Sequence, residues 1–448
     1  MIMPQAGKKP SIVKKMFIAV LCGIALGVGG IVLRDTLGAD SSTWQLIHSL
    51  LLVDITSSEG IQGIGLFFIV SQLFMRSLQL AIVPLVLTSL ALSLCNLAQP
   101  AKLGRIAMRT LLGFVGFYLA SAAVGASCAY IVSELGGFHV ALPESEVTTL
   151  TPVDAYNPLA TIINIVPNNV LAVLSNNTSI LAVCFVAVVM GICMARMGNN
   201  AQSLKSLMQA IEELIQMALK VVIEKMGPVA IFCMVSRSLA VYGTEYIQPA
   251  IVWMLTTALV CSCLAFLLYP LGIALTTKLD PLPFMRKAIK IALFGAATQS
   301  SAATLPLNMR TCIDELGCSP EISSFVMPTG MSIHMNGTTT MQIIAVTFIA
   351  GAAGTPLSPM SLLIAALLAI TVALGTPPIP AAGATLVYVV MLGVGLTSPL
   401  AQVGYSLVLA MSYVPGMAVM PMNVVGDAAV NVIVCHKEGE LDAQRYLH

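Results

Sequence analysis

Long stretches with almost no charged side chain are the feature that most constrains this chain. A helix needs about 20 apolar residues to cross a bilayer. Eight stretches come near that length or exceed it, namely Met16–Leu33, Gly63–Leu97, Thr110–Val132, Ile180–Met194, Leu207–Val241, Pro249–Thr276, Ile322–Ala350 and Val403–Val434. Only 9% of the 448 residues are charged, whereas a water-soluble domain carries roughly 25%. We therefore predict an all-α integral membrane protein that has lipid as its outer solvent.

Charge and cysteine content exclude several other classes of protein. The net charge of +1 provides no basis for nucleic-acid binding. The eleven cysteines are scattered, and the one close pair, Cys261 and Cys263, has a spacing that suits neither a zinc site nor a redox motif. We expect no cysteine-bound metal and no disulfide.

The basic residues alternate from loop to loop and so predict an orientation. They concentrate before the first stretch and after the second, fourth and sixth: Lys8, Lys9, Lys14, Lys15, Lys102, Arg105, Arg109, Arg196, Lys205, Lys278, Arg286, Lys287 and Lys290. The intervening loops carry acidic residues instead. Because cytoplasmic loops are enriched in Lys and Arg, we predict a multi-pass protein of the cell (inner) membrane with both termini in the cytoplasm.

Two further segments do not fit as simple spans. Ala288–Leu307 is rich in Ser, Thr and Ala and is interrupted at Pro306, and Ser361–Val394 is interrupted at Gly375–Gly383. Irregular backbone is tolerated at membrane depth only where protein or water covers it, so we expect two re-entrant hairpins. A helix with polar residues follows each hairpin. Paired broken segments of this kind indicate a transporter binding site.

Asp427 is the most informative of these polar residues. No Asp, Glu, Lys or Arg occurs from Ile322 to Gly426, and Asp427 ends that run. A buried carboxylate is costly unless it is paired, so Asp427 needs a proton, a metal cation or a base from another helix. Asn423 lies one turn earlier on the same face, and the two oxygens suit a small cation. A protonated structural Asp is the alternative. His334 is either a proton carrier or a neutral hydrogen-bonding residue.

Ser300, His334 and Asp427 also suggest a remote alternative, an intramembrane serine hydrolase. Against this function, the sequence contains no G-x-S-x-G turn. Ser300 and Ser301 lie in a polar segment rather than at one isolated nucleophile.

Several motifs, in order, resemble the dicarboxylate/amino acid:cation symporter family, which includes the glutamate transporters. TQSSAATLPLNMR (Thr298–Arg310) resembles the serine-rich tip of the family's first hairpin, and HMNGTTTMQ (His334–Gln342) resembles its N-M-D-G-T motif. GTPPIPAAGA, from Gly375, resembles the second hairpin tip, and NVVGDAAVN, from Asn423, resembles the end of the last span. The similarity runs roughly from residue 15 to residue 435.

The resemblance implies eight transmembrane helices, two re-entrant helical hairpins, a homotrimer and an elevator-type movement. It divides the chain into a cytoplasmic N-terminal segment (1–15), scaffold and peripheral helices (16–281), a transport core (282–435) and a cytoplasmic tail (436–448). It also implies two sets of site residues. The substrate-binding set is Ser300, Ser301, Thr338, Pro380, Ala381, Gly383, Val419 and Asn423. The cation-binding set is Asp427, Asn423, His334, Ser332, Asn336 and Met335, with Asp427 and Asn423 as metal ligands.

Departures from the family pattern concern the substrate. Members that take acidic amino acids have an Asp and an Arg where this chain has Gly416 and Val419, and some place the Arg where this chain has Gln299. Phe114 and Phe117 replace a polar cluster of the third span. The predicted function is a symporter that moves a small organic solute, an amino acid or carboxylate other than a typical acidic amino acid. Na⁺ and/or H⁺ would drive it, without an organic cofactor. The alternative is a passive channel of the same fold.

Overall fold

The computed structural model describes residues 12–38, 40–56, 60–97, 102–140, 163, 166–175, 180–243, 245, 247–378 and 381–447. Within these residues every regular element is a helix, and β pairing is limited to a bridge between Cys318 and Leu441. Hydrocarbon offers the backbone no hydrogen-bonding partners, and a helix satisfies its own backbone groups. The all-helical prediction is confirmed for this part of the chain.

The helices of the first half are mostly long and apolar. In chain order they are α1 (Ile12–Leu37), α2 (Ser42–Ile47), the π-turn η1 (His48–Leu52), α3 (Leu66–Leu97), α4 (Lys102–Glu134), α7 (Val170–Leu174), α8 (Ile180–Met197), the 3₁₀ turn η2 (Gly198–Ala201), α9 (Gln202–Val221), the π-turn η3 (Val222–Met226), α10 (Gly227–Tyr242) and α11 (Ile247–Thr277).

The helices of the second half are shorter, with one exception. They are α12 (Pro281–Thr298), α13 (Ser301–Asp314), α14 (Pro320–Ile333), α15 (Asn336–Ala352), α16 (Pro359–Leu374), α17 (Ala382–Thr385), α18 (Val387–Gly393), α19 (Pro399–Met411), α20 (Tyr413–Glu438) and α21 (Ala443–Leu447).

Six helical stretches of the described chain are long and apolar enough to cross a membrane: Ile18–Leu37, Leu66–Leu92, Gly104–Glu134, Ala182–Val241, Ile247–Thr277 and Tyr413–Glu438. The fourth combines two predicted stretches that η2 separates. α11 exposes one row of leucines, as a helix facing lipid would, whereas α20 is buried almost throughout. Such a chain is consistent with a multi-pass membrane protein whose central element is α20.

Two of the predicted spans are broken helices. The stretch Ile322–Ala350 divides into α14 and α15 at His334 and Met335, whose backbone torsions leave the helical range. The stretch Val403–Val434 divides into α19 and α20 at Ser412. A break in the middle of a buried helix exposes backbone groups that other side chains must satisfy.

Both predicted hairpin segments fold as helix–turn–helix units. α12 and α13 pack against each other, but the predicted interruption at Pro306 is wrong, because Pro306 lies inside α13. The chain reverses instead at Gln299, in the left-handed conformation (φ 49°), and at Ser300, whose hydroxyl caps α13 by accepting from the Ala303 N–H at 3.2 Å. In the second unit α16 packs against α18, and the connection between α16 and α17 falls within the predicted Gly375–Gly383.

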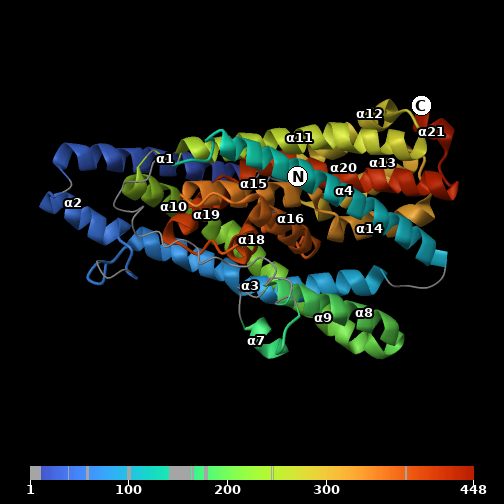
Figure 1. Ribbon diagram of the computed structural model, residues 1–448, viewed down its shortest axis with the longest axis horizontal. Coiled ribbons are helices and arrows are strands. Elements are labelled where there is room, and N and C mark those ends of the chain that lie inside the picture. The colour runs from blue at the N-terminus through green and yellow to red at the C-terminus, as the bar shows by residue number, and fades with distance from the viewer. Residues whose placement is uncertain are drawn as a thin grey trace, which may run out of the picture.

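The elements lie along one long axis (Figure 1). α2 lies at one end, and α12 and α21 lie at the other, beside the end of the chain. At that second end Arg105 and Arg109 of α4 pair with Glu438, at 2.7 and 2.8 Å. Lys287 of α12 donates to the carbonyls of Glu315, Arg445 and Tyr446. Two of the basic segments predicted to share one side of the membrane, those that contain Arg105 and Lys287, therefore lie at the same end of the molecule.

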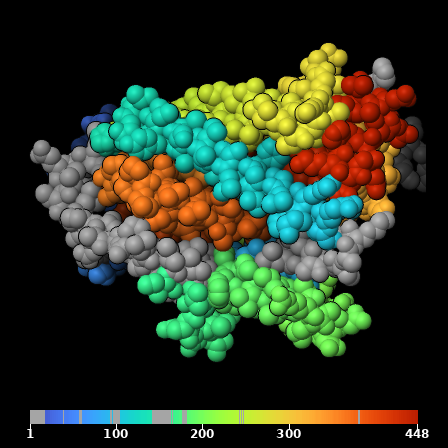
Figure 2. Space-filling view, turned by 45° about the vertical axis from the view of Figure 1, so that its right-hand side comes forward, coloured from blue at the N-terminus to red at the C-terminus, as the bar shows by residue number. Residues whose placement is uncertain are grey.

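The segments from α7 to α9 project from the body of the molecule (Figure 2, green). α9 packs along α3, which in turn contacts α14. Helices from both halves of the chain, by contrast, surround α20, which contacts α4, α11, α12, α13, α14 and α15. The functional residues predicted from sequence lie around this central helix.

Candidate functional site

The break between α14 and α15 is bridged by a side chain from another helix. The Tyr118 hydroxyl of α4 donates to the Ile333 carbonyl at 2.8 Å and accepts from the Met335 N–H at 2.7 Å. Tyr118 is 2% exposed. A single phenol thus satisfies one backbone group on each side of the interruption, which stabilises the broken geometry.

The start of α15 is capped from α20. The Asn423 Oδ1 accepts from the backbone N–H groups of Gly337 at 2.8 Å and Thr338 at 3.4 Å, and its Nδ2 donates to the Thr338 hydroxyl at 3.2 Å. These N–H groups belong to the first turn of α15, where no intrahelical acceptor is available. A Cβ at Gly337 would lie 2.3 Å from the Val419 carbonyl oxygen. Glycine is therefore required for the close approach of α15 to α20.

Asp427 is paired with a base from another helix, one of the three partners expected from the sequence. The His334 Nδ1 lies 3.0 Å from the Asp427 Oδ1, and both side chains are almost fully buried, at 1% and 2% exposure. Which atom carries the proton depends on the tautomer. The joint binding of a cation by Asp427 and Asn423 stays a prediction; in this structure the Asn423 oxygen is directed at the start of α15.

Aromatic rings enclose the His334–Asp427 pair. The His334 ring stacks on Phe114 with a centroid distance of 4.3 Å, and Tyr118 meets it edge-on at 5.7 Å. Phe117 and Tyr269 lie at 6.3 and 6.5 Å. Phe114 and Phe117 carry no oxygen atom in their side chains. These two residues therefore offer a cation near His334 fewer ligands than polar residues at the same positions would.

Two glycines allow the pair to form. A Cβ at Gly330 would lie 2.5 Å from the Asp427 Oδ1. A Cβ at Gly426 would lie 2.7 Å from the His334 Cε1 and 2.6 Å from the Tyr269 hydroxyl. That hydroxyl donates to the Met422 carbonyl at 2.8 Å and accepts from the Asn336 Nδ2 at 3.3 Å. Among the described residues, the Nε2 of His334 and the Oδ1 of Asn336 have no hydrogen-bond partner.

The tips of the two hairpin units contact each other in front of α20. The Ser300 hydroxyl donates to the Pro378 carbonyl at 2.8 Å. Gln299 is 4% exposed, and its Nε2 donates to the Tyr413 carbonyl at 2.8 Å. A Cβ at Gly416 would lie 2.7 Å from the Gln299 Oε1. The Gln299 amide therefore occupies the space beside Gly416.

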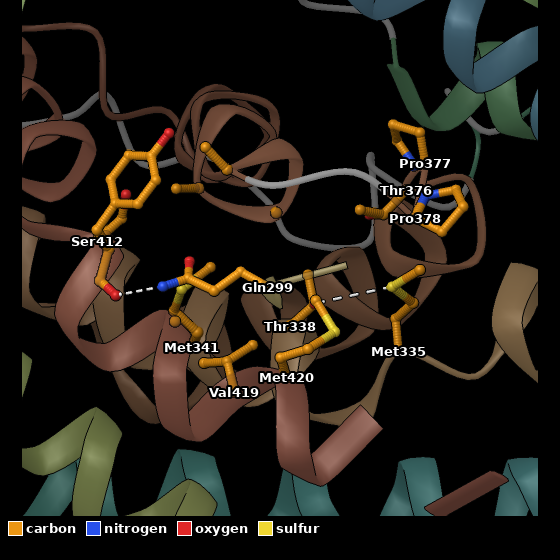
Figure 3. Close-up of a pocket in the computed structure, with 15 residues that line it drawn as sticks. Gln299, Met335, Thr338, Met341, Thr376, Pro377, Pro378, Ser412, Val419 and Met420 are labelled. Carbon is orange, nitrogen blue, oxygen red and sulfur yellow. Dashed lines mark hydrogen bonds between the residues drawn. The ribbon is translucent and has the colours of Figure 1, made fainter. Parts of the chain in front are cut away.

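A cavity of about 40 Å³ lies between the tips, α15 and α20. Figure 3 shows Gln299, Thr338, Met335 and Val419 among the residues of its wall. The dashed lines mark the hydrogen bond from Gln299 to the Tyr413 carbonyl and the one from Thr338 to the Met335 sulfur. No charged side chain lines it among the described residues. Its polar groups come from Gln299, Thr338, Thr376, Ser412 and Tyr413. In this structure the cavity has room for only a few atoms.

The predicted site residues divide into four groups. Those that line the cavity are Met335, Thr338, Ala381, Gly383 and Val419. Those that lie outside its lining, either bonded to lining residues or beside the break between α14 and α15, are Ser300, Ser301, Asn423, His334, Asn336 and Asp427. Ser332 lines a different cavity, bounded by α3 and α9. Pro380 lies outside the described residues.

Sequence reasoning did not single out Tyr118 or Tyr269, although both connect backbone groups at the site. A tyrosine in an apolar span is an ordinary residue without a distinctive spacing. The one available signal is that a buried tyrosine hydroxyl needs a partner. Tyr413 and Met420 were missed in the same way, and both line the cavity.

The geometry required for the hydrolase alternative is not present. His334 approaches Asp427, but the Ser300 hydroxyl is bonded to the Pro378 carbonyl and caps α13. The His334 Nε2, which would have to accept the serine proton, has no hydrogen-bond partner in the described part of the chain.

Comparison with known proteins gives a consistent result. Residues 12–437 match the model of the sodium:dicarboxylate symporter family. A C4-dicarboxylate transport protein of Rhizobium meliloti (strain 1021) is 28% identical over 375 residues, which cover 82% of this chain and 83% of that protein. A proton/sodium-glutamate symport protein of Bacillus caldotenax is 23% identical over 381 residues, covering 84% and 89%. An excitatory amino acid transporter of Caenorhabditis elegans is 28% identical over 272 residues, covering 60% and 53%.

Proposed function

The chain belongs to the sodium:dicarboxylate symporter family, and from this premise we propose that it couples uptake of a small, singly carboxylated solute to the entry of a cation. The family and the relatives named above are transporters, not enzymes. Symport of a small solute follows from that membership. The solute class and the coupling ion are our proposals.

The neutral cavity between the hairpin tips supports the solute class. α13 begins beside it, and the first backbone N–H groups of a helix favour an anionic group such as a carboxylate. A second carboxylate would need a cationic partner, and none lines the described part of the cavity. Val419 and Gln299 stand where members of the family that take acidic amino acids carry an Arg, so this chain lacks that partner at both positions. We therefore propose a neutral amino acid or a monocarboxylate rather than aspartate, glutamate or a C4-dicarboxylate.

The buried His334–Asp427 pair is the observation that carries cation coupling. A buried acid and base that share one hydrogen bond can gain or lose a proton with a large change in local electrostatics. Asp427 of the pair lies one helical turn after Asn423 on α20, and Asn423 hydrogen-bonds to Thr338 of the cavity wall. We propose that H⁺ is the main coupling ion at this pair, since the aromatic wall offers few ligands for Na⁺. Cation and solute would then favour each other's binding reciprocally.

The wider architecture is proposed on the same family basis. It comprises eight transmembrane helices with two re-entrant hairpins, in a homotrimer in the inner membrane, with both termini cytoplasmic. The scaffold and peripheral helices (16–281) would hold a transport core (282–435) that moves like an elevator, flanked by the terminal segments 1–15 and 436–448. The clustering of basic residues from α4 and α12 at one end of the molecule supports this orientation.

Uptake into proteoliposomes tests the function directly. Purified protein is first screened by thermal shift against L-alanine, L-serine, lactate, succinate and L-aspartate, because a bound ligand stabilises the folded state. Uptake of the best ligand is then driven by a proton gradient or by a sodium gradient. We expect concentrative uptake with the proton gradient, and a stabilising ligand with one carboxylate. Uptake driven by sodium alone, or stabilisation by succinate alone, would contradict the proposal.

Variants assign the coupling to the pair. Asp427→Asn should abolish driven uptake while the protein still inserts and purifies, and His334→Gln should flatten the pH dependence of uptake. Asp314→Asn on the exposed side of α13 is the matched control and should behave as wild type. A passive channel, the remaining alternative, cannot accumulate solute against its gradient, so concentrative uptake excludes it.

A further inference from the structure

A second cavity, of about 310 Å³, adjoins the hairpin tips. Its walls come from α3, α9 and α14, and it reaches Pro378 of the second tip. Pro378 lines both cavities, and its carbonyl accepts the hydrogen bond from Ser300. The larger cavity therefore extends to the contact that would have to open for a solute to leave or enter.

One carboxylate lies in the wall of this cavity. Glu212 of α9 is partly buried and, in the part of the lining that the structure describes, is the only ionisable residue. Its Oε1 accepts from the Gln216 Nε2 at 3.2 Å, and the Ser89 side chain of α3 also hydrogen-bonds to it. The remaining polar lining consists of neutral groups, namely Ser89, Gln209, Ser324, Thr329 and Ser332.

The cavity also approaches the buried pair. Ser332 and Ile333 line it, and they immediately precede His334 in the chain. The Ile333 carbonyl accepts from Tyr118, whose ring packs edge-on against His334. The end of α14 thus has one side in the cavity and the other beside the pair.

We propose that Glu212 is the cation-attracting residue of this cavity, and that it raises the local concentration of a small monovalent cation next to the end of α14. The inference rests on the proposed function, in which such a cation drives uptake. A single charge in a concave wall of low dielectric concentrates counter-ions and accelerates their entry. No positive side chain within the described lining opposes it.

Other charges nearby do not provide the same effect. On α9 itself, Glu213 is exposed, Lys205 is partly buried and Lys220 pairs with Glu224 of η3, and none of these four residues lines the cavity. On the facing helices, Arg76 of α3 and Glu321 of α14 also lie outside the lining. Glu213 is therefore a matched control, because it has the same charge on the same helix one position away.

The potential of the cavity is measured first, independently of transport. Thr329→Cys places a thiol in its wall, and its reaction rates with a cationic trimethylammonium methanethiosulfonate and an anionic sulfonate methanethiosulfonate are compared. Protein without this substitution corrects for the native exposed cysteines. Adding Glu212→Gln should lower the cationic-to-anionic rate ratio on the order of 10-fold. Glu213→Gln should leave it unchanged. An unchanged ratio in Glu212→Gln overturns the proposal.

Uptake measurements then connect the potential to coupling. With otherwise native protein, Glu212→Gln should raise the cation concentration for half-maximal uptake by on the order of 10-fold, and the difference should shrink at high ionic strength because salt screens the charge. Varying pH without sodium, and sodium at fixed pH, shows which cation is attracted. If the rate ratio falls as expected but wild type shows no driven uptake, the proposed function fails and the attraction stands. If driven uptake is present and Glu212→Gln matches Glu213→Gln, the role of Glu212 in coupling is refuted.

Discussion

Tyr118→Phe removes the hydroxyl that bridges the break between α14 and α15, and its cost follows from the structure. The variant loses two hydrogen bonds, to the Ile333 carbonyl and from the Met335 N–H, and leaves both groups buried. Hydrogen bonds between helices in membranes contribute about 0.6 to 1.7 kcal/mol each. The expected loss in the free energy of unfolding is therefore roughly 1–3 kcal/mol for the two bonds.

Two other tyrosines calibrate the measurement. Tyr405→Phe removes one buried bond, to the Thr385 carbonyl at 2.8 Å, and should cost about half as much. Tyr130 is 37% exposed, so Tyr130→Phe should cost almost nothing. Reversible unfolding in mixed detergent, with the apparent melting temperature as a second readout, gives the ranking. If Tyr118→Phe proves as stable as Tyr130→Phe, the hydroxyl does not hold the break and the reasoning fails.

Two further predictions concern close packing and the C-terminal contact. Gly426→Ala should cost about 1–3 kcal/mol through overpacking against His334 and Tyr269, and should also alter the pH dependence of uptake. Gly29→Ala, with nothing within 4 Å, should not change the melting temperature. Lys287→Met removes an ammonium group that donates to three carbonyls. Tyr446→Phe removes a hydroxyl that donates to the Asp280 carbonyl, and burial raises the pKa of that hydroxyl. The first should lower the melting temperature more than the second, because bonds from a charged donor are stronger.

Hydropathy predicted most of the helices because a single physical demand, about 20 apolar residues, determines them. The predicted stretch Pro249–Thr276 corresponds closely to α11, and Ile180–Met194 corresponds to α8. The same reasoning misplaced the turn of the first hairpin unit, because a proline in the first turns of a helix need not end it. The reversal depends on the left-handed Gln299 and the capping Ser300, a local preference that hydropathy does not register.

The candidate site was only partly predictable. Asp427, Asn423 and His334 were identifiable because polar residues in a long uncharged stretch are costly and rarely incidental. Their partners were not, because His334 and Asp427 are 93 positions apart and their contact depends on the rotation of α20 against the broken helix. The role of Asn423 as a cap for α15 likewise requires the break to be placed within one residue.

The hydrogen bond between His334 and Asp427 changes which partner the buried Asp427 carboxylate needs. An isolated buried carboxylate would make folding of the core depend on an external cation. Here His334 supplies a hydrogen-bonding partner at 3.0 Å, and Gly330 and Gly426 provide the space for it. The core can therefore fold around the pair itself, and in the proposed function a cation would act on the balance between the two side chains. Folding and coupling are then separable, so a variant that disrupts the pair without overpacking it should lose coupling before it loses the fold.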